Sequence, residues 1–282
     1  DPALAAWIET HVTFPCTMVD RIVPAATAET LDDIASQLGV YDPCAIACEP
    51  FRQWVIEDNF VNGRPDWDRV GAQFVEDVVP FEMMKLRMLN GSHSFLAWLG
   101  YLAGHAHISD CMRDDVFRRA ARQLMLDEQA PTLTITGVDL LAYADSLIAR
   151  FSNPALKHRT WQIAMDGSQK LPQRMLDGIR VHLARDSRWP LLALGVAGWM
   201  RYVSGTDDAG QTIDVRDPLV DKIRQRVAQS DEQQRVDALL GLEEIFGRDL
   251  PHNAQFVAGI RAAWQQLATH GAREAVAHAL NS

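Results

Sequence analysis

The sequence predicts a mainly α-helical fold with a minor strand element near its start. Two observations lead to this class. From Asp68 the pattern is helical almost to the end, whereas residues 45–58 are rich in Ile, Val, Phe and Trp and favour one or two strands. With 282 residues, 48% of them hydrophobic, the chain is also long and apolar enough to bury a sizeable core.

The first 67 residues contain clear boundary signals. Thr27 suits a helix N-cap, and Gly39 suits the position just beyond the helix end. Pro15 prevents a long helix around it. The expected elements are a short helix over 1–9, a loop or short extended piece over 11–21, a helix over 27–38, strand structure over 45–58, and a turn over 62–65.

The later helices are delimited by caps and prolines. Ser109 is expected to cap one helix, while Thr136 with Asp139, and Ser230 with Gln233, have capping-box spacing. The expected helices are 68–80 up to the interruption at Pro80, 81–103, 109–127, 136–151, 158–165, 169–185, 189–203, one opened by Asp217 or Pro218, and two that finish the chain. Residues 205–216 form a polar loop without an assigned role.

Composition excludes several classes of protein. A formal net charge of −10 and a pI of about 5.3 argue against a nucleic-acid partner, which would need a basic surface. No run of 18 apolar residues is present, so no membrane-spanning helix is expected. Four cysteines without metal-site spacing indicate free thiols in a reducing compartment, and we therefore expect a cytoplasmic protein. Because the first residue is Asp1, we expect the chain to start inside a longer protein or after processing.

The usual catalytic and nucleotide-binding motifs are absent. The sequence contains neither Gly-x-Gly-x-x-Gly after a strand nor a P-loop, and neither Gly-x-Ser-x-Gly nor His-Glu-x-x-His. His105 and His107 are two residues apart, so they would not converge on a metal from a helix. If the protein works with a dinucleotide, another domain is expected to bind it.

The strongest candidate site is Lys85, Asn90 and His93, at positions i, i+5 and i+8 of a helical run. At about 100° per residue, Asn90 lies about 140° and His93 about 80° from Lys85, within one broad face. Apolar neighbours would lower the lysine pKa and suit it to general acid/base work. The asparagine amide could stabilise a developing alkoxide, and the histidine could orient a substrate oxygen. The alternative is a capped, partly buried polar face.

Three further groups are weaker candidates. Lys170 lies in the first turn of an expected helix, where a cation is unfavourable, so a bound anion or a partner such as Asp166 is expected nearby. The cluster that includes His158 and Arg159 could meet a substrate carboxylate, although solvated charges are commoner. Asp20 could accept bonds from substrate hydroxyls or orient the lysine, although a local ion pair with the next residue is the commoner meaning.

Three segments, Phe14–Ile22, Glu49–Asp58 and Lys85–Ser94, resemble the polyol-specific long-chain dehydrogenases of the mannitol dehydrogenase family. The Lys-x4-Asn-x2-His motif is specific, and the resemblance covers essentially the whole chain. It implies that residues 1–282 are the helical C-terminal substrate domain, with a fold similar to the C-terminal domain of 6-phosphogluconate dehydrogenase. It also implies that NAD is bound mainly by an N-terminal Rossmann domain of the same protein, absent here, and that no metal is needed.

The resemblance also implies roles for residues. Lys85 matches the acid/base, Asn90 the carbonyl-polarising asparagine and His93 a substrate-orienting histidine, while Asp20 and Lys170 match residues that line the polyol site. Where mannitol-oxidising members have an arginine, this chain has Gln162, so the partner of a substrate carboxylate is left to Arg159 or His158.

Residues 153–174 are most similar to members that interconvert D-mannonate and D-fructuronate with NAD in hexuronate breakdown. The expected ligand is therefore a sugar acid. The alternatives are a polyol dehydrogenase that converts mannitol to fructose, and a helical binding domain that has no chemistry of its own when isolated.

Overall fold

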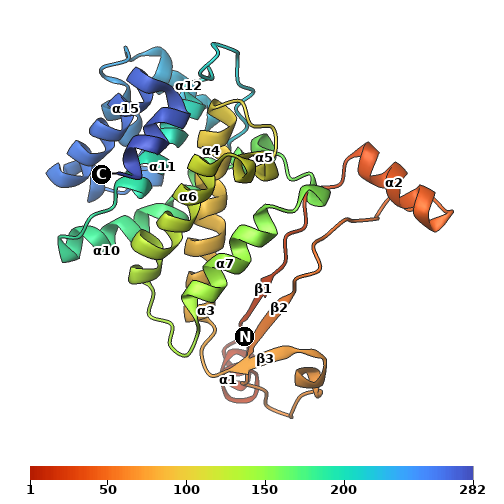
Figure 1. Ribbon diagram of the computed structural model, residues 1–282. Coiled ribbons are helices and arrows are strands. Elements are labelled where there is room, and N and C mark those ends of the chain that lie inside the picture. The colour runs from red at the N-terminus through yellow and green to blue at the C-terminus, as the bar shows by residue number, and fades with distance from the viewer. Residues whose placement is uncertain (282) are drawn as a thin grey trace. The chain divides into compact units, whose positions relative to one another are not determined.

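A computed structural model describes residues 1–281, and it divides the chain into two compact units. The first unit is Asp1–Lys85, and the second begins at Leu86. Helices dominate the second unit, whereas all three strands lie in the first (Figure 1). The expectation of a mainly α-helical chain with a minor strand element near its start is confirmed.

The first unit is built around a three-stranded sheet of order β1-β2-β3. β1 pairs antiparallel with β2, placing Asp20 opposite Gln53, while β2 and β3 pair in parallel. Met18, Val55 and Val78 form its small core. The elements are α1 (Pro2–His11), β1 (Thr17–Asp20), α2 (Ala28–Leu38), β2 (Gln53–Glu57), the 3-10 turn η1 (Trp67–Val70), β3 (Ala72–Val75) and α3 (Val79–Met84).

Helix α2 ends as the sequence indicates, but residues 68–80 do not form the expected helix. Thr27 accepts a hydrogen bond from the Thr30 N–H, and Gly39 has the left-handed conformation (φ 73°). After η1, Gly71 takes a φ of 96°, which ends the turn and sends the chain into β3. Pairing of β3 with β2 therefore outweighs the helical pattern of this short segment.

The second unit is a helical bundle with three π-helical segments. Its elements are η2 (Lys85–Gly91, which starts at the last residue of the first unit), α4 (Ser92–Leu102), α5 (Ile108–Arg113), α6 (Asp115–Gln123), η3 (Leu124–Gln129), η4 (Ala130–Thr132), α7 (Leu140–Phe151), η5 (Pro154–Leu156), α8 (Thr160–Ala164), α9 (Gly167–Leu171), η6 (Pro172–Leu176), α10 (Asp177–Arg185), α11 (Pro190–Val203), α12 (Val220–Ala228), α13 (Arg235–Leu240), α14 (Glu243–Phe246), η7 (Leu250–His252) and α15 (Ala254–Ala279). The η labels cover both 3-10 turns (η4, η5, η7) and π turns (η2, η3, η6).

Three expected caps are wrong in detail. Ser109 lies inside α5, and Asp114 caps α6 by accepting the Val116 N–H. Asp139, not Thr136, caps α7, because its carboxylate accepts the Ala142 N–H at 2.9 Å. The Ser230–Gln233 pair does not open a helix, since α13 begins only at Arg235. In each case a nearby aspartate or a short turn satisfies the backbone instead.

Two buried helices, α4 and α11, form the centre of the bundle. α11 packs against α4 and α15 (Figure 1). Nearly all residues of α4 and α11 are buried. The start of α11 is capped by the carboxylate of Glu128, which accepts the Leu191 and Leu192 N–H groups at 2.8 and 2.7 Å. Glu128 on η3 therefore binds two N–H groups that have no partner within α11. The N-cap residue of α11, Trp189, makes no side-chain hydrogen bond to them.

Two further findings concern the cysteines and membrane spans. All four cysteines are free, and Cys111 alone among them is buried. No helix within residues 1–281 combines the length and apolar character needed to cross a membrane.

Candidate functional site

The helical run that carries Lys85 and Asn90 contains a π turn. α3, η2 and α4 follow one another without a break from Val79 to Leu102, and η2 begins at Lys85. A π turn closes i→i+5 hydrogen bonds, so Asn90 lies one turn beyond Lys85 rather than about 140° away from it. The angle of about 140° expected from α-helical geometry therefore does not apply to this pair.

Lys85 is held in the first unit by the strand that carries Asp20. Its ammonium donates to the carbonyl oxygen of Val19 at 2.6 Å. Asp20 is the next residue on β1 and is only 1% exposed. The two sequence-predicted residues Lys85 and Asp20 are thus neighbours through Val19 in a half-buried setting.

His93 lies inside the bundle, at the second residue of α4, directly after the π segment. It is 5% exposed, stacks on Phe151 with ring centres 4.6 Å apart, and meets the His158 ring edge-on at 4.7 Å. Burial lowers the pKa of His93 well below its usual value, and the charges of His158, Arg174, Arg150 and Lys170 act in the same direction. His93 is therefore a neutral hydrogen-bonding group at neutral pH, and so is His158, whose pKa burial lowers to about 4.

Lys170 is the fourth of the five residues of α9, and its ammonium points to backbone carbonyls. It donates to the carbonyls of Ile163 and Met165, rather than to the Asp166 carboxylate that the sequence suggested. Burial lowers the pKa of Lys170 to about 8; the charge of Arg174 acts in the same direction, while Asp166 and Asp217 oppose it.

The turn before Lys170 needs a glycine for a packing reason. Asp166, not Gly167, has the positive φ, at 56°. A Cβ on Gly167 would lie 2.3 Å from Nε1 of Trp199, on the buried helix α11. Gly167 therefore permits α9 to approach α11 closely, and this approach positions Lys170.

Arg174 is the residue that sequence reasoning missed. It lies on η6, four residues after Lys170, and its Nη1 donates to Ser94 Oγ at 3.0 Å and to the Asn90 carbonyl at 3.4 Å. Arg174 thus joins η6 to the helical run that carries Asn90 and His93. The i+4 spacing from Lys170 was visible in the sequence, but it becomes informative only once Ser94 is known to face it.

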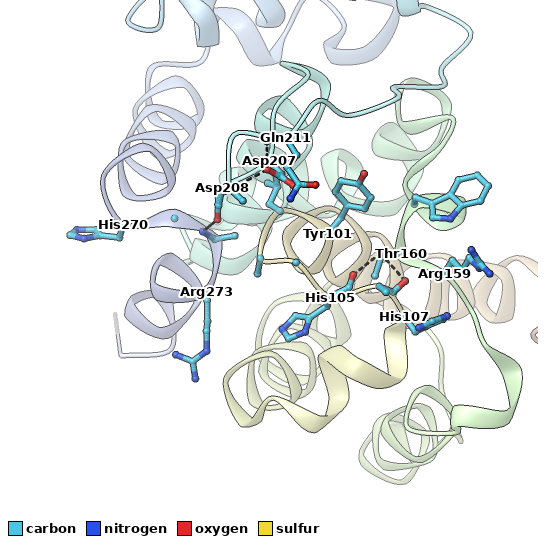
Figure 2. Close-up of a pocket in the computed structure, with 18 residues that line it drawn as sticks. Tyr101, His105, His107, Arg159, Thr160, Asp207, Asp208, Gln211, His270 and Arg273 are labelled. Atoms are coloured by element: carbon cyan, nitrogen blue, oxygen red, sulfur yellow. Dashed lines mark hydrogen bonds between the residues drawn. The ribbon is translucent and has the colours of Figure 1, made fainter.

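The structure places Arg159 elsewhere. Arg159 lines a cavity of about 790 Å³ with Tyr101, His107 and Asp207 (Figure 2). None of Asn90, His93 and Lys170 lines that cavity. His158, the other residue suggested for a substrate carboxylate, lies against His93. The structure therefore brings together Asn90, His93, His158, Lys170 and Arg174, and it separates Arg159 from them.

Metal ligation has no candidate among the residues described. Within residues 1–281, no cluster of three or more His, Cys, Asp or Glu side chains is placed to hold a metal ion. His105 and His107 instead face aspartates, Asp114 at 3.7 Å and Asp110 at 3.2 Å.

Two family models match consecutive parts of the chain. The model described as mannitol dehydrogenase C-terminal domain matches residues 77–268, and the model described as mannitol dehydrogenase Rossmann domain matches residues 1–69. The boundary between the two matches lies near the division of the structure into two units.

Individual relatives agree with these matches. The chain is 70% identical over 99% of its length to the uncharacterized oxidoreductase YeiQ of Escherichia coli (strain K12), and 69% identical over 98% to the D-mannonate oxidoreductase of the same organism. It spans 57% of the length of each. A solved structure of Pseudomonas fluorescens mannitol 2-dehydrogenase, a ternary complex with NAD and D-mannitol, matches with a TM-score of 0.91 and 37% identity, covering 100% of this chain and 57% of the other.

Proposed function

Because the chain belongs to the mannitol dehydrogenase family, we propose that it is the substrate-binding and catalytic part of an NAD-dependent oxidoreductase that interconverts D-mannonate and D-fructuronate. One observation carries the choice of a sugar acid. The groups around His93 that carry a charge at neutral pH are all basic: Arg174, Arg150 and Lys170. Such a set favours an anionic substrate. The 69% identity to a D-mannonate oxidoreductase supports the same choice.

We propose that NAD is held mainly by a Rossmann domain of the same protein. The match of residues 1–69 to the family's Rossmann model supports this arrangement. The chain itself lacks the Gly-x-Gly-x-x-Gly turn that would accommodate a pyrophosphate, so none of its residues is assigned to the cofactor. When bound, NADH supplies the hydride to the ketone carbon of the substrate, and NAD⁺ removes it in the reverse direction.

The residues of this chain move and hold the proton. In reduction, the Lys85 ammonium gives a proton to the ketone oxygen as it becomes a hydroxyl; in oxidation, the neutral amine takes that proton back. The Asn90 amide, one π turn away, donates a hydrogen bond to the developing alkoxide. Neutral His93 orients a substrate oxygen by hydrogen bonding, since its lowered pKa keeps it from carrying a charge. Asp20, buried beside Val19, accepts bonds from substrate hydroxyls.

A second candidate function is oxidation of mannitol to fructose. The TM-score of 0.91 to a mannitol 2-dehydrogenase solved with D-mannitol favours it. In this second function, Lys85, Asn90 and His93 would keep the roles proposed above. Gln162, in place of the arginine expected in mannitol-oxidising members, argues against it.

The test is NADH consumption by the protein that carries this chain together with its Rossmann domain. D-fructuronate and D-fructose are supplied separately, and kcat/KM is measured for each. A strong preference for D-fructuronate supports the sugar-acid proposal. A preference for D-fructose overturns it in favour of the second candidate, and no turnover of either overturns both.

The pKa of Lys170 predicts how substrate affinity depends on pH. With a pKa of about 8, the ammonium is present below pH 8 and lost as the pH rises through this value. The KM for D-fructuronate is therefore expected to rise severalfold between pH 7 and 9.5, while an uncharged substrate shows a smaller change. Lys170→Arg keeps its charge throughout this range and is expected to flatten the KM profile. If the KM of Lys170→Arg depends on pH as that of the wild type does, the prediction that the Lys170 ammonium strengthens substrate binding is wrong.

A further inference from the structure

We propose that Arg174 receives the carboxylate of the sugar acid and so determines the preference for an acid over a neutral polyol. This inference rests on the proposed function. It assigns the role to a residue that no resemblance singled out, and it replaces Arg159, which lines a cavity that Arg174 does not line.

The guanidinium of Arg174 has one hydrogen-bonded end and one edge without hydrogen-bond partners among the described residues. Nη1 makes both of its bonds, to Ser94 Oγ and to the Asn90 carbonyl. Nε is buried without a hydrogen-bond partner. The hydrogen bonds that Arg174 donates to the described residues both come from Nη1, and none comes from Nη2. Nε and Nη2 form the side of a guanidinium that binds a carboxylate with two parallel hydrogen bonds. Ser94 and Asn90 therefore fix the plane of the group while its carboxylate-binding edge is left free.

The charge of Arg174 also lacks a counter-ion among the described residues. Among residues 1–281, no carboxylate lies within ion-pair distance of its side chain, although burial lowers its pKa to about 10. Arg180, six residues further on, shows the ordinary arrangement, with ion pairs to Asp177 at 3.0 Å and Asp249 at 2.7 Å. A largely buried guanidinium without a counter-ion is costly, and a substrate carboxylate would supply that counter-ion.

The neighbouring cation points to the same ligand. Lys170 and Arg174 are four residues apart on a continuous helical run, and like charges at this spacing repel each other. His158 carries no charge at neutral pH, because its pKa is about 4, so the two cations are Lys170 and Arg174. An anion beside Arg174 and Lys170 relieves this repulsion. Both cations also lie close enough to His93 to lower its pKa.

The proposal is tested with Arg174→Lys in the protein that carries this chain together with its Rossmann domain. Lysine keeps the charge but loses the two-bond edge. We expect kcat/KM for D-fructuronate to fall about tenfold to a hundredfold, mainly through KM, with D-fructose affected less than threefold. Arg180→Lys, on the adjacent helix and outside the site, is the matched control and should leave both substrates unchanged.

Each outcome is decisive. An equal loss on both substrates assigns Arg174 to structure alone and overturns the inference, as does an unchanged kcat/KM for D-fructuronate. If the wild type does not reduce D-fructuronate at all, the proposed function fails, and this is recognised before any variant is compared. If Arg174→Lys does not fold, Ser94→Ala removes one anchor of the guanidinium, and a selective rise in KM for D-fructuronate supports the inference, whereas an equal change on both substrates overturns it.

Discussion

Replacing Lys85 with alanine is expected to lower kcat for D-fructuronate reduction by about a hundredfold to ten-thousandfold, the usual contribution of a positioned general acid. The ammonium lies at the start of the π turn and is oriented by its bond to the Val19 carbonyl. Water in its place would be a weaker and unpositioned acid. KM should change much less than kcat, since the proton is transferred only in the transition state.

Two variants make this prediction specific. Lys85→Arg keeps the positive charge but cannot release its proton near neutral pH, so it should be nearly as impaired as alanine. Lys222→Ala removes an exposed lysine on α12 that pairs with Glu244, and it should retain full activity. Steady-state rates with saturating NADH measure all three. Turnover close to that of the wild type in Lys85→Ala would refute the acid/base role.

The central helices could be predicted from the sequence because their signals are local and strong. The apolar run after Trp189 predicts a buried helix, and α11 begins at Pro190, a favourable first position, and ends at Val203 as expected. Thr27 and Gly39 likewise delimit α2 correctly. In these segments, local preference and burial favour the same structure.

β3 could not be predicted in the same way. Ala72–Val75 has only four residues, so its structure is decided by a partner strand, and β2 lies about twenty positions earlier in the sequence. The pattern that suggested a helix from Asp68 is too short to outweigh a parallel pairing that satisfies the backbone of both strands.

The sequence offers candidate residues for the site but not the geometry that relates them. Residue type and spacing select Lys85, Asn90 and His93 as candidates, yet the π turn that contains the first two has no sequence pattern of its own. The requirement for Gly167 comes from its close approach to Trp199, which no local sequence pattern shows. Arg174 was missed because its importance comes from contacts with Ser94 and Asn90, about eighty residues away.

Replacing Glu128 with alanine is expected to destabilise the helical unit by about 2–4 kcal/mol, the largest stability effect we predict. Glu128 is 3% exposed and accepts the Leu191 and Leu192 N–H groups at the start of α11. Alanine leaves both donors buried without a partner, at the helix around which the unit packs. Urea unfolding monitored by circular dichroism gives the free energy of unfolding, and Glu232→Gln, at an exposed position, is the control for a lost carboxylate.

Glu128→Gln distinguishes the effect of the charge from that of the hydrogen bonds to α11. The amide keeps one acceptor oxygen, so this variant should lose less free energy of unfolding than Glu128→Ala. Burial raises the pKa of Glu128 to about 7; the two backbone donors oppose this shift. The folded state therefore binds this proton more tightly than the unfolded state, whose carboxyl has a pKa near 4.5, so its protonation stabilises the wild type as the pH falls from about 7 to 4.5. Glutamine does not titrate, so the difference in free energy of unfolding between the wild type and Glu128→Gln should widen as the pH falls over that interval. A difference that narrows towards acid would mean that the carboxylate binds α11 as an anion with an ordinary or lowered pKa, and that the helix N-terminus outweighs burial at this position.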